Sequence, residues 1–385
     1  MFRILFQLKR FYFIYYKESL LFFKKIYENI RSSLFKKKDN IFIHKAIPNI
    51  NKEIDIVLDH KTYDFYSLQP KNTEPFYVNS PLFIILKKHK KAIFNNLLEI
   101  LQKSYDFKVK IGLELEFYIL NNIKNIDIVK ELKKCLPNIE NIEKEMGENQ
   151  FEIKTIPTTN IKKFVEDYFK IIDVLNNFAD NNNLELNLEA SPFENDCGSA
   201  LQINFSIIDE NNKNLFARQK NEKNIMQESQ LLLNCMAGLL KNINNNLLLY
   251  IKDYKCLDRF DIKKNQYIVD NNKYPAPTYI SWGINNRSTC IRVPTPSNII
   301  IENYIEEDNK NRRIEYRIPS ACADLQLVLI GIFTSIIEGI DNNLIPHIEK
   351  TSFNVLLKND NLEKIETDFE KINDIFSINE DVLFF

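Results

Sequence analysis

The sequence predicts an α+β protein built on a mostly antiparallel sheet. Two observations support this prediction. Short strand-like segments and amphipathic helices alternate irregularly along the chain, rather than as repeated strand–helix units, and only seven glycines occur. Neither a P-loop motif nor a G-x-G-x-x-G motif is present, so a doubly wound nucleotide-binding fold is disfavoured. With 385 residues, 44% hydrophobic and 27% charged, the chain can bury the core of one large domain or two ordinary ones.

Residues 1–38 form a basic, aromatic-rich extension. They hold ten Lys or Arg against two Glu, a net charge of +8, whereas the rest of the chain carries −9. Their longest apolar run, FYFIYY, is far shorter than the ~20 residues of a membrane span, and no cleavable leader is evident. We interpret this segment as a helical extension that docks on the body or on a neighbouring subunit. A membrane-surface helix, a targeting segment and a wrongly assigned start stay open as alternatives.

The remaining elements follow from apolar spacing and from turn residues. Short apolar runs broken by Pro, Asn and Asp predict a small strand-rich module over residues 39–90, followed by a large domain over 91–385. Helical spacing predicts helices at residues 91–105, 160–184, 225–250, 324–341 and 360–376. Strands are expected in IGLELEFYIL, LELNLEAS, ALQINFSII, TYISWGI, TCIRVP and RIEYRI.

Composition narrows the function classes. The overall net charge of −1 gives no reason to expect nucleic acid as a partner. Six scattered cysteines without a C-x-x-C pair suit free thiols in a reducing cytoplasm better than disulfides or a zinc site. The four histidines all lie before residue 91 or after residue 346. Any chemistry in the middle of the chain therefore proceeds without a histidine from that stretch.

Glu114 and Glu116 in IGLELEFYIL are the first candidate site residues. Residues two apart in a strand share a face, so these two like charges repel each other. A half-solvated strand explains a lone Glu-x-Glu, whereas a divalent-cation site needs further oxygen ligands. EKEMGENQFEIKT supplies two of them, because Glu145 and Glu152 flank a turn at Gly147.

Further charges complete a candidate metal–phosphate site. Glu315 lies between Arg313 and Arg317 in RRIEYR, and NNRSTCIRVP contributes Arg287 and Arg292. Carboxylates can hold divalent cations, the cations neutralise polyphosphate, and arginine forks bind the remaining phosphate oxygens. Taken singly, each arginine is also explained by an ordinary surface or interface salt bridge.

The order of these motifs resembles the catalytic domain of glutamine synthetase over residues 90–345. The motifs are, in order, IGLELEF, EMGENQFEI, PFENDCGSALQINFSIIDENNKNLFA, AGLL, PAPTYISWGINNRSTCIRVP, RRIEYRIPS and IIEGI. The resemblance implies the family fold, with a small β-grasp module at residues 39–90 and a curved, mostly antiparallel sheet in the catalytic domain. It also implies an ATP-dependent ligase that joins glutamate and ammonia through an acyl phosphate, with Mg²⁺ or Mn²⁺ as cofactor. A ring-shaped homo-oligomer is implied as well.

The resemblance carries roles to individual positions. Metal ligands are Glu116, Glu145 and Glu152 for one cation, and Glu114, Glu315 and Gln202 for the other. Catalytic or phosphate-binding arginines are Arg287 and Arg317, nucleotide contacts are Arg292, Asn204 and Ser206, and substrate contacts are Gly198 and Cys197. The only tryptophan, Trp282, matches an aromatic residue beneath the site, and is equally explained as core.

Several positions depart from the family pattern. Gln202 and Asn204 replace two histidines, Cys197 replaces an asparagine, and Cys256 replaces an arginine that meets the substrate. The glutamate of the family's flap falls at Pro275. Asp324–Gln326 replaces NPY, and residues 40–90 offer no assignable aspartate to deprotonate ammonium. Three hypotheses therefore stay open: a glutamine synthetase, a ligase that uses another amine or acid, and a nucleotide-binding homologue with impaired catalysis.

Overall fold

The computed structural model describes residues 81–121, 126–136, 139–220, 226–295, 304–352, 354–357 and 361–376. Residues 86–378 belong to one compact unit, and this unit contains the candidate site. The predicted extension at 1–38 and the strand-rich module at 39–90 lie outside the described residues, apart from the last ten residues of the module.

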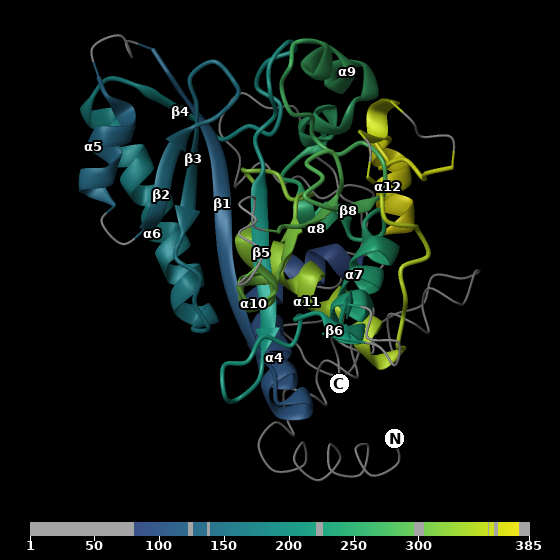
Figure 1. Cartoon of the computed structure of the whole chain (residues 1–385). Coiled ribbons are helices and arrows are strands. Elements are labelled where there is room, and N and C mark those ends of the chain that lie inside the picture. The colour runs from purple at the N-terminus through teal and green to yellow at the C-terminus, as the bar shows by residue number, and fades with distance from the viewer. Residues whose placement is uncertain are drawn as a thin grey trace, which may run out of the picture. The chain divides into compact units, whose positions relative to one another are not determined.

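The centre of the unit is a sheet with strand order β2-β3-β1-β5-β10-β9-β8, to which β4 adds beside β1 (Figure 1). Its strands are β1 Lys108–Leu120, β2 Ile139–Lys144, β3 Gln150–Thr155, β4 Glu185–Asn187, β5 Leu201–Ile208, β8 Trp282–Ile284, β9 Ile291–Val293 and β10 Ile314–Tyr316. Each neighbouring pair is antiparallel except β8 and β9, which are parallel. A separate short pair joins β6 Gln219–Lys220 to β7 Met226–Gln227. The predicted antiparallel α+β architecture is confirmed.

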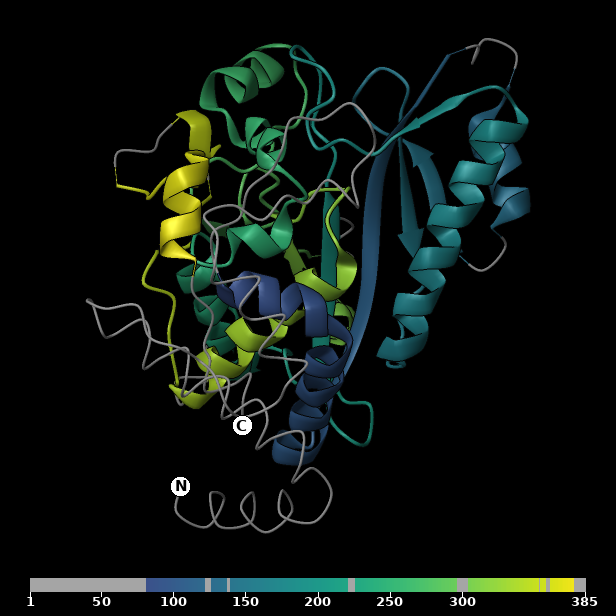
Figure 2. The same cartoon turned by 180° about the vertical axis from the view of Figure 1, so that it is seen from behind.

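Helices pack on and around this sheet, and in Figure 2 the long strand β1 is seen between α4 on its left and α6 on its right. The α-helices are α4 Pro81–Tyr105, α5 Ile128–Cys135, α6 Ile161–Asn181, α7 Gln230–Asn242, α8 Leu247–Tyr250, α9 Ile262–Asp270, α10 Tyr304–Asn311, α11 Leu325–Asp341 and α12 Phe369–Ile375. Two 3₁₀ segments are η3 Tyr254–Phe260 and η4 Val355–Leu357. In the part of the chain that the structure describes, no helix combines the length and the apolar character that crossing a bilayer requires.

Strand β1 shows why the sheet has two different faces. Leu113, Leu115 and Phe117 are buried in the core, whereas Glu114 and Glu116, on the alternate face, are partly exposed. Period-two alternation therefore separates the apolar core face from a polar face that carries the carboxylates. The sequence prediction for this strand is confirmed.

Three predicted helices have different limits in the structure. Helix α4 begins at Pro81, so residues 81–90 are helical rather than part of a strand-rich module. Proline is tolerated in the first turn of a helix, and Phe83 and Leu86 extend the buried face that continues to Leu97.

The predicted helix at 225–250 is divided. Its first residues join the short β6–β7 pair, and the Ser229 side chain then accepts a hydrogen bond from the Leu232 amide to cap α7. The helix stops at the asparagine-rich segment after residue 242 and resumes as α8. The helix predicted at 360–376 is shorter, because Asp368 caps α12 and starts it at Phe369. Local capping residues, which periodicity does not register, set these boundaries.

Candidate functional site

One polar face runs across three neighbouring strands and carries most of the predicted site residues. The side chains on this face are Glu114 and Glu116 from β1, Gln202 and Asn204 from β5, and Arg313, Glu315 and Arg317 from β10 and its flanks. Glu114 is the register partner of Gln202, and Glu315 that of Asn204. We refer to these seven residues as the site row. Each strand places its site residues two positions apart, about 7 Å along the strand.

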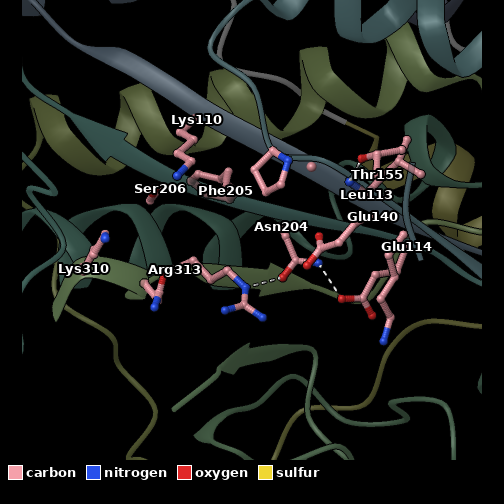
Figure 3. Close-up of a pocket in the computed structure, with 14 residues that line it drawn as sticks. Lys110, Leu113, Glu114, Glu140, Thr155, Asn204, Phe205, Ser206, Lys310 and Arg313 are labelled. Carbon is pink, nitrogen blue, oxygen red and sulfur yellow. Dashed lines mark hydrogen bonds between the residues drawn. The ribbon is translucent and has the colours of Figure 1, made fainter. Parts of the chain in front are cut away.

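Two pockets open along the site row, one toward each end of these strands. The first has a volume of about 330 Å³ and its polar lining includes Lys110, Glu114, Glu140, Lys154, Asn204, Ser206, Lys310 and Arg313 (Figure 3). We call it the cationic pocket. The second, of about 50 Å³, is lined by Glu116, Glu145, Cys197, Gly198, Gln202, Arg259, Arg287 and Arg317 among others. We call it the mixed pocket. Of the site row, Glu114, Asn204 and Arg313 line the cationic pocket, and Glu116, Gln202 and Arg317 line the mixed pocket.

The three carboxylates assigned to the first cation position come from adjacent strands. Glu116 and Glu152 are register partners, and Glu145 follows β2 at the hairpin turn, where Asn149 adopts a left-handed conformation with φ 65°. Burial and the charge of Glu145 raise the pKa of Glu116 to about 7. Burial raises the pKa of Glu152 as well, and the charges of Glu114 and Glu116 raise it further. The shifts show buried carboxylates close to one another, which the neighbouring cations, among them Lys154 beside Glu152, only partly offset.

The first position suits a divalent cation by its chemistry, since hard cations prefer carboxylate oxygens. Among the described residues, however, no three carboxylate, imidazole or thiol groups lie close enough together to form a preassembled metal centre. Glu116 accepts hydrogen bonds from the Ala200 amide at 2.8 Å and from Gln202 Nε2 at 2.5 Å. These contacts hold one carboxylate in place, on the side of the mixed pocket.

The second cation position is different, because protein groups already bind its oxygens. Arg317 Nη1 lies 3.0 Å from Glu315 Oε1, and Arg292 Nη1 lies 2.6 Å from Glu315 Oε2. Arg317 Nη1 also donates to Gln202 Oε1 at 3.0 Å. Glu315 is 1% exposed; burial raises its pKa, but the charges of Arg317 and Arg292 outweigh burial, so the pKa lies below its ordinary value. These residues do not fit a divalent cation.

Asn204 and Arg313 extend this network into the cationic pocket. Arg313 Nε donates to Asn204 Oδ1 at 2.8 Å, and Asn204 Nδ2 donates to Glu114 Oε1 at 3.1 Å, as the dashed lines of Figure 3 show. Asn204 therefore lies at the cationic pocket, and Ser206 lines the same pocket. Their role as nucleotide contacts stays a prediction. Arg313 was noted only as a neighbour of Glu315, and its place in this pocket was missed.

Lys154 is another residue near the site row that sequence reasoning missed. It lies two positions after Glu152 on β3, so the two side chains share a face. Its Nζ lies 2.6 Å from Glu143 Oε1 and 2.8 Å from Glu152 Oε2, and its register partner is Glu114. The available signal was the spacing itself, since a lysine two residues after a predicted metal ligand on a strand must face the same site.

The remaining predicted arginine, Arg287, is exposed at the mixed pocket. Its guanidinium carbon lies 5.1 Å from the centre of the Tyr274 ring, a cation–π contact. Tyr274 and Pro275 come from the segment that replaces the family's flap, and both line this pocket. Thus the segment still covers the predicted substrate end, although it supplies an aromatic ring instead of a glutamate.

Arg259 provides an arginine close to the position of Cys256. It is 3% exposed, and its Nη2 donates to the carbonyls of Arg317, Ile318 and Pro319. Burial lowers its pKa to about 10. It lines the mixed pocket three residues after Cys256, whose Sγ instead lies 3.5 Å from Cys322 Sγ. The departure at Cys256 therefore does not remove arginine from this region.

Gly198 and Cys197 line the mixed pocket, and their role as substrate contacts stays a prediction. A Cβ at residue 198 would approach Arg259 Cγ to 2.5 Å and the Ala190 carbonyl to 2.7 Å, so only glycine fits this close approach. Cys197 is largely buried, and its carbonyl accepts a hydrogen bond from the Tyr118 hydroxyl at 2.8 Å. Backbone geometry, rather than the thiol, shapes this wall.

Two other positions singled out in the sequence have structural explanations. Trp282 is 7% exposed and donates from Nε1 to the Ile348 carbonyl at 2.8 Å. Asp324 caps α11 by accepting from the amides of Gln326 and Leu327, and it pairs with Lys90.

Comparison with known proteins decides the family. Residues 125–370 match the family model described as glutamine synthetase, catalytic domain, which is more than half of the chain. The chain belongs to the glutamine synthetase family. The matched range begins after Glu114 and Glu116, so their assignment depends on the IGLELEF motif and on their register with the matched strands.

Relatives within this family are distant. The Escherichia coli gamma-glutamylputrescine synthetase PuuA is 23% identical over 320 residues, which cover 72% of this chain and 62% of that protein. A glutamine synthetase of Clostridium saccharobutylicum is 28% identical over 176 residues, 46% of this chain and 34% of the relative. The chain therefore spans less than two thirds of the length of these curated relatives.

Solved structures agree on the fold. GmaS in complex with ADP superposes with a TM-score of 0.58 at 14% identity, covering 74% of this chain and 67% of the other. Plasmodium falciparum glutamine synthetase gives a TM-score of 0.56 at 16% identity, covering 74% and 70%. The predicted glutamine synthetase fold is confirmed for the catalytic domain.

Proposed function

We propose that this chain is an ATP-dependent carboxylate–amine ligase of the glutamine synthetase type. The observation that carries the proposal is the site row, which joins the cationic pocket to the mixed pocket across three adjacent strands. A phosphate donor in one pocket and a carboxylate acceptor in the other would meet above Glu315. Holding two reactants in adjoining pockets is the main requirement of phosphoryl transfer.

The cationic pocket suits the polyphosphate of ATP. Lys110, Lys154, Lys310 and Arg313 supply four positive charges around its wall, and Ser206 supplies a hydroxyl. Arg292 does not line this pocket, but it forms an ion pair with Glu315 of the site row. When bound at the first position, Mg²⁺ or Mn²⁺ would neutralise charge on the reacting groups, and Glu116, Glu145 and Glu152 would hold it.

The mixed pocket suits the carboxylate of the acid substrate. Arg259 and Arg317 line this pocket, and their buried Nε atoms have no hydrogen-bond partner among the described residues. Unsatisfied buried donors are costly, and an anionic ligand would satisfy them. Arg287 also lines this pocket, forms no ion pair with the described residues, and would add a further positive charge.

The proposed reaction has two steps, phosphoryl transfer to the acid and then attack by the amine. A carboxylate oxygen attacks the γ-phosphorus of ATP, an oxygen–phosphorus bond forms, and the bond to the bridging oxygen breaks so that ADP leaves with the electron pair. An amine then attacks the carbonyl carbon of the acyl phosphate, loses a proton, and displaces phosphate as the carbon–oxygen bond breaks. Arg317 and Arg259 would hold the acid, and the Tyr274 segment would limit access of water.

The acid is proposed to be glutamate, and the amine ammonia or a larger amine. The larger amine is favoured by one specific observation: the departures from the family, Cys197, Cys256 and Pro275, all lie at or near the acceptor side. PuuA, which is named for a gamma-glutamyl amide of putrescine, supports the same alternative. Because the family assembles as rings, we also propose a homo-oligomer, for which light scattering at micromolar concentration should give several times the 45.6 kDa chain mass.

The test is formation of γ-glutamyl hydroxamate by purified protein with ATP, glutamate, hydroxylamine and Mg²⁺ or Mn²⁺, with phosphate release recorded in parallel. Hydroxylamine traps an acyl phosphate without requiring ammonium deprotonation. Arg317→Lys keeps the charge but removes the fork, and should reduce product formation ~10²–10³-fold. Glu131→Ala, on the exposed surface of α5, is the control and should retain activity. ATP binding without hydroxamate would refute the ligase proposal and favour a nucleotide-binding homologue.

A further inference from the structure

Lys154 places a fixed positive charge among carboxylates from three strands. Its Nζ contacts Glu143 on β2 and Glu152 on its own strand β3, and its register partner is Glu114 on β1. Glu152 is 2% exposed and the Lys154 side chain is 29% exposed. The ammonium group is thus partly buried on the site face, at the wall of the cationic pocket.

Lys154 supplies the positive charge of a lysine side chain at this wall. Its ammonium group lies at ion-pair distance from two carboxylates, those of Glu143 and Glu152.

The second cation position has more positive than negative charge. Of its two carboxylates, Glu315 is bound directly by Arg292 and Arg317, and Glu114 has Lys154 as its register partner on the same face. Arg313 lies beside them and donates to Asn204. A divalent ion placed there would be repelled by cations a few ångströms away. The amide groups of Gln202 and Asn204 point their nitrogens at Glu116 and Glu114, so they act as donors to these carboxylates.

We infer that Lys154 takes the place of the second divalent cation, and that this chain binds the phosphates of a nucleoside triphosphate through its own cations, without a metal ion at that position. Lys110, Lys310 and Arg313 line the same pocket and share the task. The inference rests on the proposed function only in taking the cationic pocket as the nucleotide site.

Calorimetric titration of the full chain with ATP, once in EDTA and once in excess Mg²⁺, tests the inference without any variant. The two dissociation constants should agree within about threefold. Binding that occurs only with Mg²⁺ would overturn the inference. Binding in neither buffer would overturn it too, together with the proposed function.

Substitutions of Lys154 provide a second test of the inference. Lys154→Met should weaken ATP binding in EDTA roughly 10- to 100-fold, and Mg²⁺ should restore most of the loss, because a metal could then bridge phosphate and the freed carboxylates. Lys154→Arg keeps the charge and should bind in EDTA within about threefold of the unaltered chain. Lys144→Met is the matched control, since Lys144 is exposed on the opposite face of β2 and should have no effect.

The outcomes separate the two proposals. Lys154→Met protein that binds ATP in EDTA as well as the unaltered chain would overturn the role of Lys154. If this variant does not fold, the ATP affinities of the unaltered chain and of Lys154→Arg, each measured in EDTA and in Mg²⁺, decide whether binding depends on a metal ion. Metal-independent ATP binding combined with an absence of hydroxamate would refute the ligase and leave the inference standing.

Discussion

The two cation positions of the site are built from similar residues but differ in how their charge is balanced. At the first, burial raises the pKa of Glu116, Glu145 and Glu152, and neighbouring carboxylates raise it further. At the second, both oxygens of Glu315 are already bound by arginines. A carboxylate at a position where the family has a metal ligand is therefore not sufficient evidence that it binds a metal. The cations within reach of each oxygen decide whether an ion has a place there.

The largest effect should come from removing the shared carboxylate of the second position. Glu315→Ala would leave Arg292 and Arg317 facing each other without their buried partner, and should lower the free energy of unfolding by about 3–5 kcal/mol. Urea denaturation measures this. Glu131→Ala removes an exposed pair with Lys134 and should cost less than about 1 kcal/mol. A loss of similar size in both variants would contradict the account of the second position.

The next effect concerns the wall of the mixed pocket. Gly198→Ala forces a Cβ against Arg259 and the Ala190 carbonyl, and should destabilise the protein by about 1–3 kcal/mol. The affinity for the acid should fall as Arg259 is displaced. Gly112→Ala on β1 is the matched control, because the nearest atom there, the Thr155 carbonyl oxygen, is 3.3 Å away. Equal thermal stability of the two variants would show that the close approach at Gly198 is not required.

Manganese titration followed by electron paramagnetic resonance can distinguish the two positions directly. Glu145→Gln removes a ligand of the first position and should weaken Mn²⁺ binding at least ~10-fold. Glu315→Gln alters a carboxylate that the arginines already hold, and should change Mn²⁺ affinity less than about threefold. The reverse pattern would place the metal at the second position and contradict our assignment.

The smallest effect is expected at the flap segment. Tyr274→Leu removes the ring beneath Arg287, a contact of about 0.5–1 kcal/mol, and should raise the KM for the acid roughly two- to fivefold. Tyr267→Leu, on the exposed side of α9, serves as the control. An unchanged KM in the Tyr274 variant would remove this segment from the substrate pocket.

Sequence reasoning predicted the sheet and the polar face of β1, because period-two alternation in IGLELEFYIL determines both. It also placed Glu145 and Glu152 on a hairpin, which the turn around Gly147 indicates. It could not predict the division of residues 225–250, since the Ser229 cap interrupts a continuous apolar pattern. The predicted start of helix α4 was ten residues too late, because Pro81 was interpreted as a break although proline is compatible with a first helical turn.

The candidate site was predictable in its members and not in its contacts. Motif order identified Glu315 and Arg317, but only the structure shows that they bind each other. Lys154 and Arg259 carry no motif, and they enter the site because β3 and η3 bring them there. Charge balance depends on side chains from distant segments, so a linear pattern of residues does not reveal it.

The central claim is that phosphate passes from the cationic pocket to an acid in the mixed pocket. The most direct test incubates the protein with ATP, an amine and glutamate labelled with ¹⁸O in its side-chain carboxylate, and then examines the released phosphate by ³¹P NMR. We predict that each phosphate carries one ¹⁸O atom from the acid. Phosphate released without the label would mean that water is the acceptor, and would contradict the ligase mechanism.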